Sequence, residues 1–269
     1  MRTRTLAVAG ARLHHEVRGC GPLVLLIGGG VYDAWGLRDL ADALAERFTV
    51  LSYDRRGNSR SPLAGERAVQ RVEEHADDAH RLITEVGGGP AFVFGNSSGA
   101  LIGLELAARH PGDVRLLAAH EAPLLTLLPD PDRWRRMVSE IGAAYAQGGY
   151  IPALGVFGAA MGMTAGGAEG PDTPDAVAAA LRMGVNADFF IGYEVPGFAT
   201  HTPPLDLAVP VVPLVGADSA GEPPHEATLA LATRLGVGAV TVPGGHGGFG
   251  EHPAAFATTL TNLFEESTQ

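Results

Sequence analysis

The segment GNSSG, residues 95–99, carries the strongest chemical signal in this sequence. A short apolar run, residues 91–94, precedes the segment, and a helix-like run, residues 100–109, follows it directly. Glycines two residues before and two residues after Ser97 allow a strand and a helix to pass closely at a sharp turn, which projects the serine hydroxyl above a sheet. We therefore predict that Ser97 is a nucleophile. Ser98 lacks this symmetric glycine frame.

A serine hydroxyl needs a neighbouring base before it can attack a substrate. Among the ten histidines, His246 is the best placed, because it lies in the glycine-rich segment PGGHGGF after the last predicted strand. His252 precedes a proline at a predicted helix start, which is typical of a cap or surface residue. We predict that His246 takes the Ser97 proton, with an exposed loop histidine as the alternative.

Two carboxylates are candidates for orienting that histidine. Asp218 follows a late predicted strand in the segment VGADSAG, which agrees with the chain order serine, acid, histidine. Glu121, in the segment AAHEAP, follows the preceding core strand and could reach the histidine from the adjacent loop. We favour Asp218 and keep Glu121 as the alternative, because a shift of one residue decides whether Asp218 points inward.

Developing negative charge on a substrate oxygen requires backbone N–H donors. Ser98, the residue after the nucleophile, supplies one donor, and the loop in LIGGGVYDAW supplies the second, from Gly29 or else from Gly30. A phosphate-binding loop is disfavoured, since the G-x-G-x-x-G spacing and a P-loop lysine are both absent from this segment. No histidine–carboxylate cluster shows metal-ligand spacing. We therefore expect neither a metal nor another cofactor.

Strand-like and helix-like segments alternate along the parts of the chain that must position these residues. Residues 23–30 read as a buried central strand, and the alternation continues to about residue 123 and resumes at residue 209. This pattern predicts an α/β fold with a mostly parallel sheet and helices on both faces. Residues 1–123 and 209–269 form the predicted core domain. Residues 124–208 contain helix-like segments only and are predicted to be a helical cap inserted into the core.

Composition excludes several other classes of protein. The formal net charge of −11 over 269 residues disfavours nucleic-acid binding. No run of residues reaches the roughly 18 unbroken apolar positions of a membrane helix, and the N-terminal segment lacks the apolar run of a signal peptide. Cys20 is the single cysteine, which excludes an internal disulfide and is typical of a reducing compartment. We therefore expect a cytoplasmic protein.

The motifs together resemble the α/β-hydrolase superfamily. LVLLIGGG, YDRRGNSRSP, GNSSG and PGGHGGF are similar to its oxyanion strand, the following loop, the nucleophile elbow and the histidine loop. The resemblance implies that residues 124–208 form a lid over the site. Two positions depart from the pattern: Ile27 stands where many members have histidine, and Ser219 stands where many have the acid.

The predicted cap is rich in aromatic residues and methionine, which favours an apolar or aromatic substrate. The candidate substrate-binding residues are Phe157, Met161, Phe189, Phe190 and Tyr193. Its weakly polar character is also compatible with a homodimer. In the YDRRGNSR segment, Arg55 and Arg56 are expected to hold the loop.

We therefore expect a serine hydrolase that acts by acyl transfer on an apolar carboxylic ester, lactone or thioester. Epoxide hydrolysis and dehalogenation are disfavoured, because superfamily members with those activities usually use an aspartate nucleophile. The alternatives are a lyase or cyclase on the same scaffold, or a protein that binds a small apolar ligand without turnover.

Overall fold

A single eight-stranded sheet forms the centre of the computed structural model, which describes residues 1–87, 89–163 and 173–267. The strand order is β1-β2-β4-β3-β5-β6-β7-β8, and all pairs from β4 to β8 are parallel. The strands are β1 (Arg2–Val8), β2 (Ala11–Arg18), β3 (Leu23–Ile27), β4 (Thr49–Tyr53), β5 (Ala91–Asn96), β6 (Val114–His120), β7 (Val211–Gly216) and β8 (Val240–Val242). The predicted fold class, a mostly parallel sheet with helices on both faces, is confirmed.

The first two strands form an antiparallel hairpin at one edge of the sheet, where β1 pairs with β2 and β2 with β4. The chain turns at Gly10, whose φ of 76° is a conformation that favours glycine. The six strands from β4 to β8 in the sheet order all run in the same direction, so their carboxyl ends lie along one edge of the sheet. Loops that follow β3, β5, β6, β7 and β8 are therefore neighbours in space.

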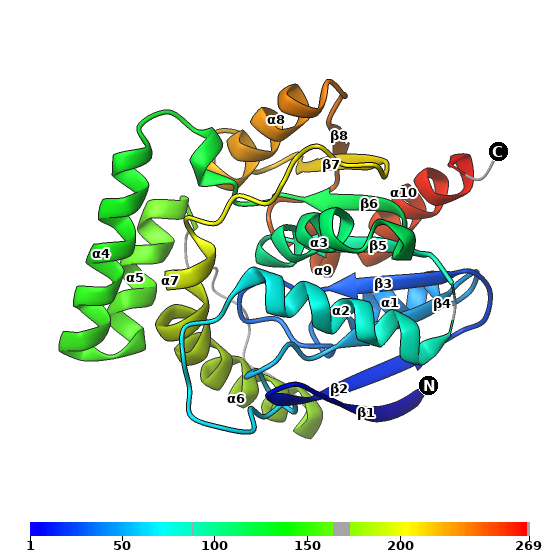
Figure 1. Cartoon of the computed structure of the whole chain (residues 1–269), viewed down its shortest axis with the longest axis horizontal. Coiled ribbons are helices and arrows are strands. Elements are labelled where there is room, and N and C mark those ends of the chain that lie inside the picture. The colour runs from blue at the N-terminus through cyan, green and yellow to red at the C-terminus, as the bar shows by residue number, and fades with distance from the viewer. Residues whose placement is uncertain (88, 164–172, 268–269) are drawn as a thin grey trace.

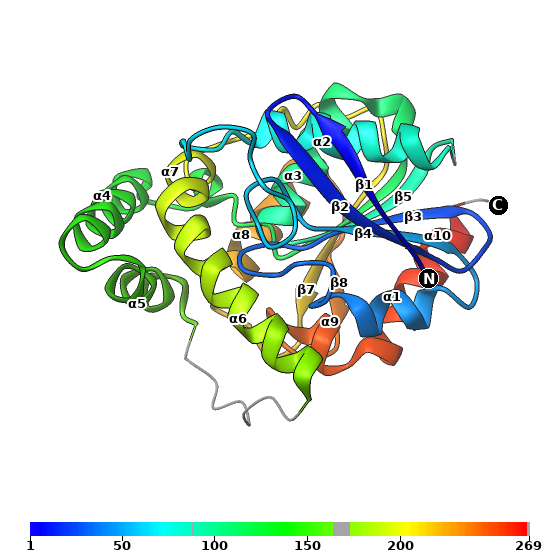
Figure 2. The same cartoon turned by 90° about the horizontal axis from the view of Figure 1, so that it is seen from below.

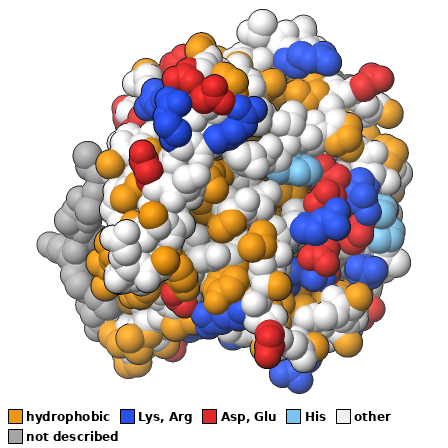
Figure 3. All heavy atoms as spheres, turned by 60° about the vertical axis from the view of Figure 1, so that its left-hand side comes forward, with side chains coloured by type: hydrophobic (Ala, Val, Ile, Leu, Met, Phe, Trp, Pro, Cys, Tyr) orange, Lys and Arg blue, Asp and Glu red, His pale blue; other side chains and the backbone are white. Residues whose placement is uncertain are grey.

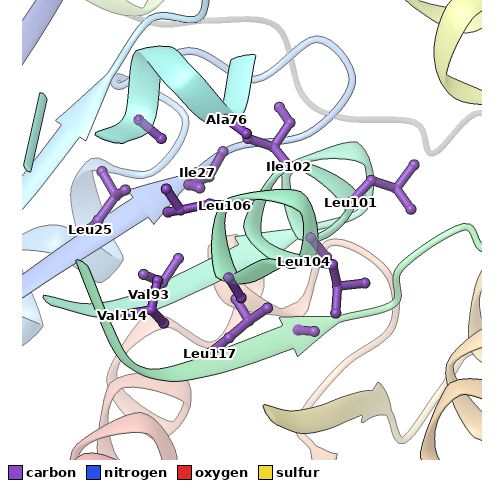
Figure 4. Packing of buried hydrophobic residues seen from close by; sticks show 14 of the residues in the cluster. Leu25, Ile27, Ala76, Val93, Leu101, Ile102, Leu104, Leu106, Val114 and Leu117 are labelled. Carbon is purple, nitrogen blue, oxygen red and sulfur yellow. The ribbon is translucent and has the colours of Figure 1, made fainter. Parts of the chain in front are cut away.

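Alternate residues of the central strands pack against helices on opposite faces (Figure 1). Leu25 and Ile27 of β3 contact the layer of α2 (Val72–Val86), α3 (Ser98–Arg109) and α8 (Pro223–Leu235), as Figure 4 shows for α3. Val24 and Leu26 face the layer of α1 (Arg38–Leu44), α9 (Gly248–Glu251) and α10 (Pro253–Glu266). Two apolar layers thus hold the sheet rigid beneath its loops.

Residues between β6 and β7 form helices and, in their described part, no strand. These helices are α4 (Pro131–Gly148), α5 (Tyr150–Met161), α6 (Pro174–Phe189), the π-helical turn η3 (Phe190–Glu194) and α7 (Val195–Phe198). They lie together on one side of the sheet in both views (Figures 1 and 2). A separate apolar cluster that includes Trp134, Met137 and Ile141 holds α4 against α5. Residues 164–172 of the predicted cap lie outside the described residues, and the domain boundaries stay a prediction.

None of the described helices combines the length and the apolar character that a membrane crossing requires.

Candidate active site

Ser97 lies on a strained turn between β5 and α3, with φ of 54° and ψ of −124°. The two framing glycines permit this geometry. A Cβ on Gly95 would lie 2.5 Å from the carbonyl oxygen of Gly99, and a Cβ on Gly99 would lie 2.1 Å from that of Ile27. The Ser97 N–H donates to the carbonyl oxygen of His120 at 2.8 Å, which ties the turn to β6. Ser97 is thus held in a backbone conformation that few non-glycine residues adopt, and such conformations occur often at functional sites.

Glu121 is the carboxylate that contacts His246, with its Oε2 2.6 Å from the histidine Nδ1. Its side chain is fully buried, and its other oxygen accepts the Gly216 N–H at 2.9 Å and the hydroxyl of Ser219. Burial alone would raise the pKa of Glu121, but hydrogen bonds and charge interactions with His246 outweigh it and lower the pKa to about 2. Glu121 is therefore a carboxylate at neutral pH.

Asp218 does not occupy this position, and the sequence-based preference for it over Glu121 is corrected by the geometry. The Asp218 side chain is exposed, while the next residue, Ser219, is 1% exposed and points toward Glu121. The register of the loop after β7 thus turns Ser219 inward and Asp218 outward. The residue after β6 takes over the contact with the histidine, as the alternative interpretation of the sequence allowed.

The backbone around Gly29 approaches the elbow very closely. A Cβ on Gly29 would lie 2.7 Å from the Ser97 Cβ and 2.9 Å from the Ser98 nitrogen, so only glycine fits there. The N–H of Gly30 already donates to the Ser98 hydroxyl at 2.9 Å. This engagement favours Gly29 over Gly30 as the second donor to an oxyanion, beside the Ser98 N–H.

Arg55 holds the loop that carries these donors. Its guanidinium donates to the carbonyl oxygens of Gly28, Gly30 at 2.7 Å and Tyr32 at 3.3 Å, and to Glu194 at 2.8 Å. Arg55 is 1% exposed and Glu194 fully buried, so this ion pair joins the oxyanion loop to η3 inside the protein. The sequence indicated a structural role for Arg55 but contained no signal for its partner, which lies 139 positions later. Arg56 instead pairs with Asp78 at 2.7 Å.

Asn96 and His120 support the histidine loop, and sequence reasoning missed both residues. The Asn96 amide donates to the His120 Nδ1 at 3.0 Å and to the backbone oxygen of His246 at 3.2 Å. Burial lowers the pKa of His120 to about 3, so its ring stays neutral and accepts this hydrogen bond. Asn96, directly before Ser97 in the chain, thus holds the backbone of His246 in place.

A cavity of about 680 Å³ opens above these groups and is lined by Gly29, Ser97 and His246 from the core. Phe157 and Phe190 line it from the helical segment, and Met161 lines a smaller cavity beside it. Phe189 and Tyr193 line neither cavity, which corrects their assignment to substrate binding. Their rings stack on each other at 5.4 Å between centroids, and Phe189 is fully buried.

Among the described residues, one group of side chains has the composition of a metal site: His80, His110 and Asp113. Asp113 is 2.5 Å from the His80 Nδ1, and Asp77 is 2.9 Å from the His110 Nε2. One candidate ligand atom from each of the three residues lies within 4.8 Å of the others, and the two histidine rings stack with centroids 4.1 Å apart and an interplanar angle of 5°. These residues line neither cavity, and their arrangement is that of histidine–carboxylate pairs.

Comparisons with known proteins agree with this fold. The sequence model of the alpha/beta hydrolase fold family matches residues 22–168. The chain is 34% identical over 271 residues to the uncharacterized hydrolase YraK of Bacillus subtilis (strain 168), covering 97% of this chain and 96% of that protein.

Two solved structures extend the similarity over nearly the whole chain. An alpha/beta hydrolase from Sphaerobacter thermophilus DSM 20745 is 29% identical with a TM-score of 0.71, over 97% of this chain and 100% of that one. A thermophilic esterase from Thermogutta terrifontis has a TM-score of 0.78 at 19% identity, with 100% of both chains covered. The chain belongs to the alpha/beta hydrolase family and is an enzyme of the hydrolase class.

Proposed function

We propose that this enzyme is a serine hydrolase that acts on uncharged, apolar carboxylic esters, lactones or thioesters through Ser97, His246 and Glu121. One observation carries the proposal: the buried Glu121 contacts the His246 Nδ1 at 2.6 Å, and the same histidine lines the cavity that contains Ser97. The contact leaves the His246 Nε2 as the nitrogen available to a serine proton.

The reaction follows from the positions of these groups. His246 takes the Ser97 proton as the serine Oγ attacks the substrate carbonyl carbon, while Glu121 stabilises the imidazolium. The N–H groups of Gly29 and Ser98 hold the oxyanion. His246 then protonates the leaving oxygen or sulfur, and later activates water to hydrolyse the acyl-enzyme.

An apolar, uncharged substrate follows from the lining of the large cavity. None of the described side chains that line it carries a carboxylate, a guanidinium or an ammonium group, and His246 is its one ionisable group apart from the Tyr32 phenol. A charged substrate group would lose its hydration there without gaining a partner. We extend the proposal to residues 124–208 as the cap over this cavity. We also place the enzyme in the cytoplasm, which suits the exposed free thiol of Cys20.

A fluorophosphonate, which labels activated serines, tests the proposal directly. We expect intact-mass spectrometry to show one adduct on the parent protein and none on Ser97→Ala. Ser139→Ala is the matched control, because Ser139 is exposed on α4 and lines neither of the cavities at Ser97, so this variant should retain labelling. A folded parent protein that takes up no label would contradict the hydrolase mechanism and favour a lyase, a cyclase or a ligand-binding protein.

A further inference from the structure

Two cavities of very different size meet at Ser97. The large one measures about 680 Å³ and the small one about 30 Å³. Both are lined by Ser97, Phe157, Met163 and Phe190, so the side chains of the helical segment separate them above the serine. On the same measure the small cavity has about one-twentieth of the volume of the large one, so it suits a short substituent and the large cavity a long one.

The catalytic groups are divided unequally between the two cavities. His246 and Gly29 line the large cavity and do not line the small one. The small cavity lies on the other side of Ser97, between Ser98 and Leu101 of α3 and Pro123 and Leu125 after β6. A substrate carbonyl bound at Ser97 therefore has the proposed base on one side only.

The chemistry of acyl transfer assigns a substrate group to each cavity. The leaving oxygen must lie beside His246, because His246 protonates it. The carbonyl oxygen points to the N–H groups of Gly29 and Ser98. The acyl substituent then occupies the remaining direction at the tetrahedral carbon, away from His246 and toward the small cavity.

We propose that the enzyme is selective for esters with a very short acyl group, of the size of acetyl, and a bulky apolar alcohol. This inference rests on the proposed function. The Ser97 Oγ forms a bond to the acetyl carbon, the bond from that carbon to the alkoxy oxygen breaks, and the alcohol leaves with the proton from His246. Water then adds its OH to the acetyl carbonyl carbon, its other proton returns through His246 to Ser97, and acetic acid leaves and loses its proton to the solvent, so no further reactant is needed.

The walls of the small cavity keep it small. Met161, Leu125 and Phe198 are 1%, 2% and 3% exposed, respectively, and each packs within a core cluster. Close-packed interiors resist expansion, because extra methylene groups force side chains out of their preferred rotamers and shift the backbone. A longer acyl chain would have to displace these side chains, so the small cavity acts as a size filter for the acyl group.

The large cavity owes part of its width to small residues on α5. Ile151, Gly155 and Ala159 recur at a spacing of four, which places them along one face of the helix, and all three line the cavity. A Cβ on Gly155 would meet no heavy atom within 4 Å. Ile151 of this row is 70% exposed, and other apolar side chains lie scattered over the side of the molecule shown in Figure 3. The alcohol therefore has apolar surroundings with room for a long or branched chain.

Two isomeric esters distinguish an enzyme that accepts a short acyl group and a long alcohol from one that accepts a long acyl group and a short alcohol. Octyl acetate and methyl nonanoate have the same formula and release primary alcohols, but they carry the long chain on opposite sides of the ester. We expect kcat/KM for octyl acetate to exceed that for methyl nonanoate by at least about tenfold, since misplacing even a single methylene in a filled pocket changes rates by about 10–200-fold.

Two variants should lower the preference for octyl acetate over methyl nonanoate, one by narrowing the large cavity and the other by enlarging the small one. Gly155→Leu narrows the large cavity and should lower kcat/KM for octyl acetate by about tenfold, with little effect on ethyl acetate. Gly142→Leu is the matched control, because Gly142 lies exposed on α4 and also has no heavy atom within 4 Å of its Cβ position. Met161→Ala enlarges the small cavity and should raise the relative rate with methyl nonanoate.

The outcomes distinguish a failure of this inference from a failure of the hydrolase mechanism. Hydrolysis of methyl nonanoate at the same rate as octyl acetate, or faster, with a fluorophosphonate adduct on Ser97, overturns the inference alone. Absence of both the adduct and hydrolysis overturns the proposed function and this inference together. If Met161→Ala does not fold, the isomer ratio of the parent protein and the Gly155→Leu result still decide the matter.

Discussion

The core loops around Ser97 and helix α5 form opposite walls of one cavity, yet they are built differently. On the core side, Glu121 is buried with both carboxylate oxygens hydrogen-bonded, and backbone atoms surround the Cβ direction of Gly99. On the α5 side, the side chains of residues 150–161 make no hydrogen bond in the described structure, and the Cβ direction of Gly155 is open.

This difference separates two tasks of the enzyme. Catalytic groups need positions held to a fraction of an ångström, which buried hydrogen bonds and close backbone contacts provide. Selection by size needs only apolar walls at a suitable distance, which a helix with small residues provides. We therefore expect substitutions on the core side to change the rate or the stability strongly, and substitutions on α5 to change mainly which substrate is accepted.

The largest expected effect is on the rate in Glu121→Gln. The amide cannot stabilise an imidazolium and can favour the wrong histidine tautomer, so we expect kcat to fall by about 10³–10⁴-fold. Asp218→Asn is the matched control, because the Asp218 side chain is exposed, and its kcat should stay within about twofold of the parent. Steady-state hydrolysis of an apolar ester measures both. The reverse result, with Asp218→Asn inactive and Glu121→Gln active, would restore Asp218 as the acid.

The second largest expected effect is a loss of stability in Arg55→Ala, measured as a lower free energy of unfolding. Removing one partner of a buried ion pair leaves Glu194 without its cation, which typically costs about 3–5 kcal/mol. Arg135→Ala removes an exposed partner of Asp132 on α4 and should cost at most about 1 kcal/mol. Urea unfolding compares the two variants. Equal losses would show that the buried pair with Glu194 is not what holds the oxyanion loop against η3.

A smaller effect is the dependence of stability on pH. Glu121 has a native pKa of about 2, whereas an unfolded glutamate titrates near about 4.3. Because the native pKa is the lower one, the contribution of the carboxylate is complete above the unfolded pKa and is lost as the pH falls through this window. The difference in free energy of unfolding between the parent and Glu121→Gln should therefore shrink as the pH falls from about 5 to about 2, the range that these two pKa values define. A constant difference would contradict the lowered pKa.

The smallest expected effect is the gain in stability from Gly155→Ala. Replacing a helical glycine with alanine stabilises a helix by about 0.5–1 kcal/mol when the methyl group meets no obstacle. Gly155 satisfies that condition, and Gly142→Ala on α4 should give a similar gain. Thermal unfolding measures both variants. A loss of stability in Gly155→Ala but not in Gly142→Ala would mean that the α5 face is closely packed and would contradict the open space beside Gly155.

The sequence by itself predicted the α/β fold correctly, because that fold depends on local periodicity. Buried parallel strands appear as short apolar runs, helices as apolar residues at a spacing of three to four, and the elbow as glycines around Ser97. These signals need no knowledge of distant contacts. The close packing of Gly29 against Ser97 and Ser98 is different, because it joins the loop after β3 to the turn after β5 and so depends on the pairing of these two strands.

Only the tertiary structure decided which carboxylate reaches His246 and which aromatic residues line the cavity at Ser97. His120 of β6 pairs with Leu214 of β7, so Glu121 lies level with the end of β7 and replaces the carboxylate expected there. The packing of Phe189 and Tyr193 away from the cavity depends likewise on contacts between distant segments. A sequence specifies the order of residues along the chain, whereas these contacts depend on the register of neighbouring strands and on the docking of helices.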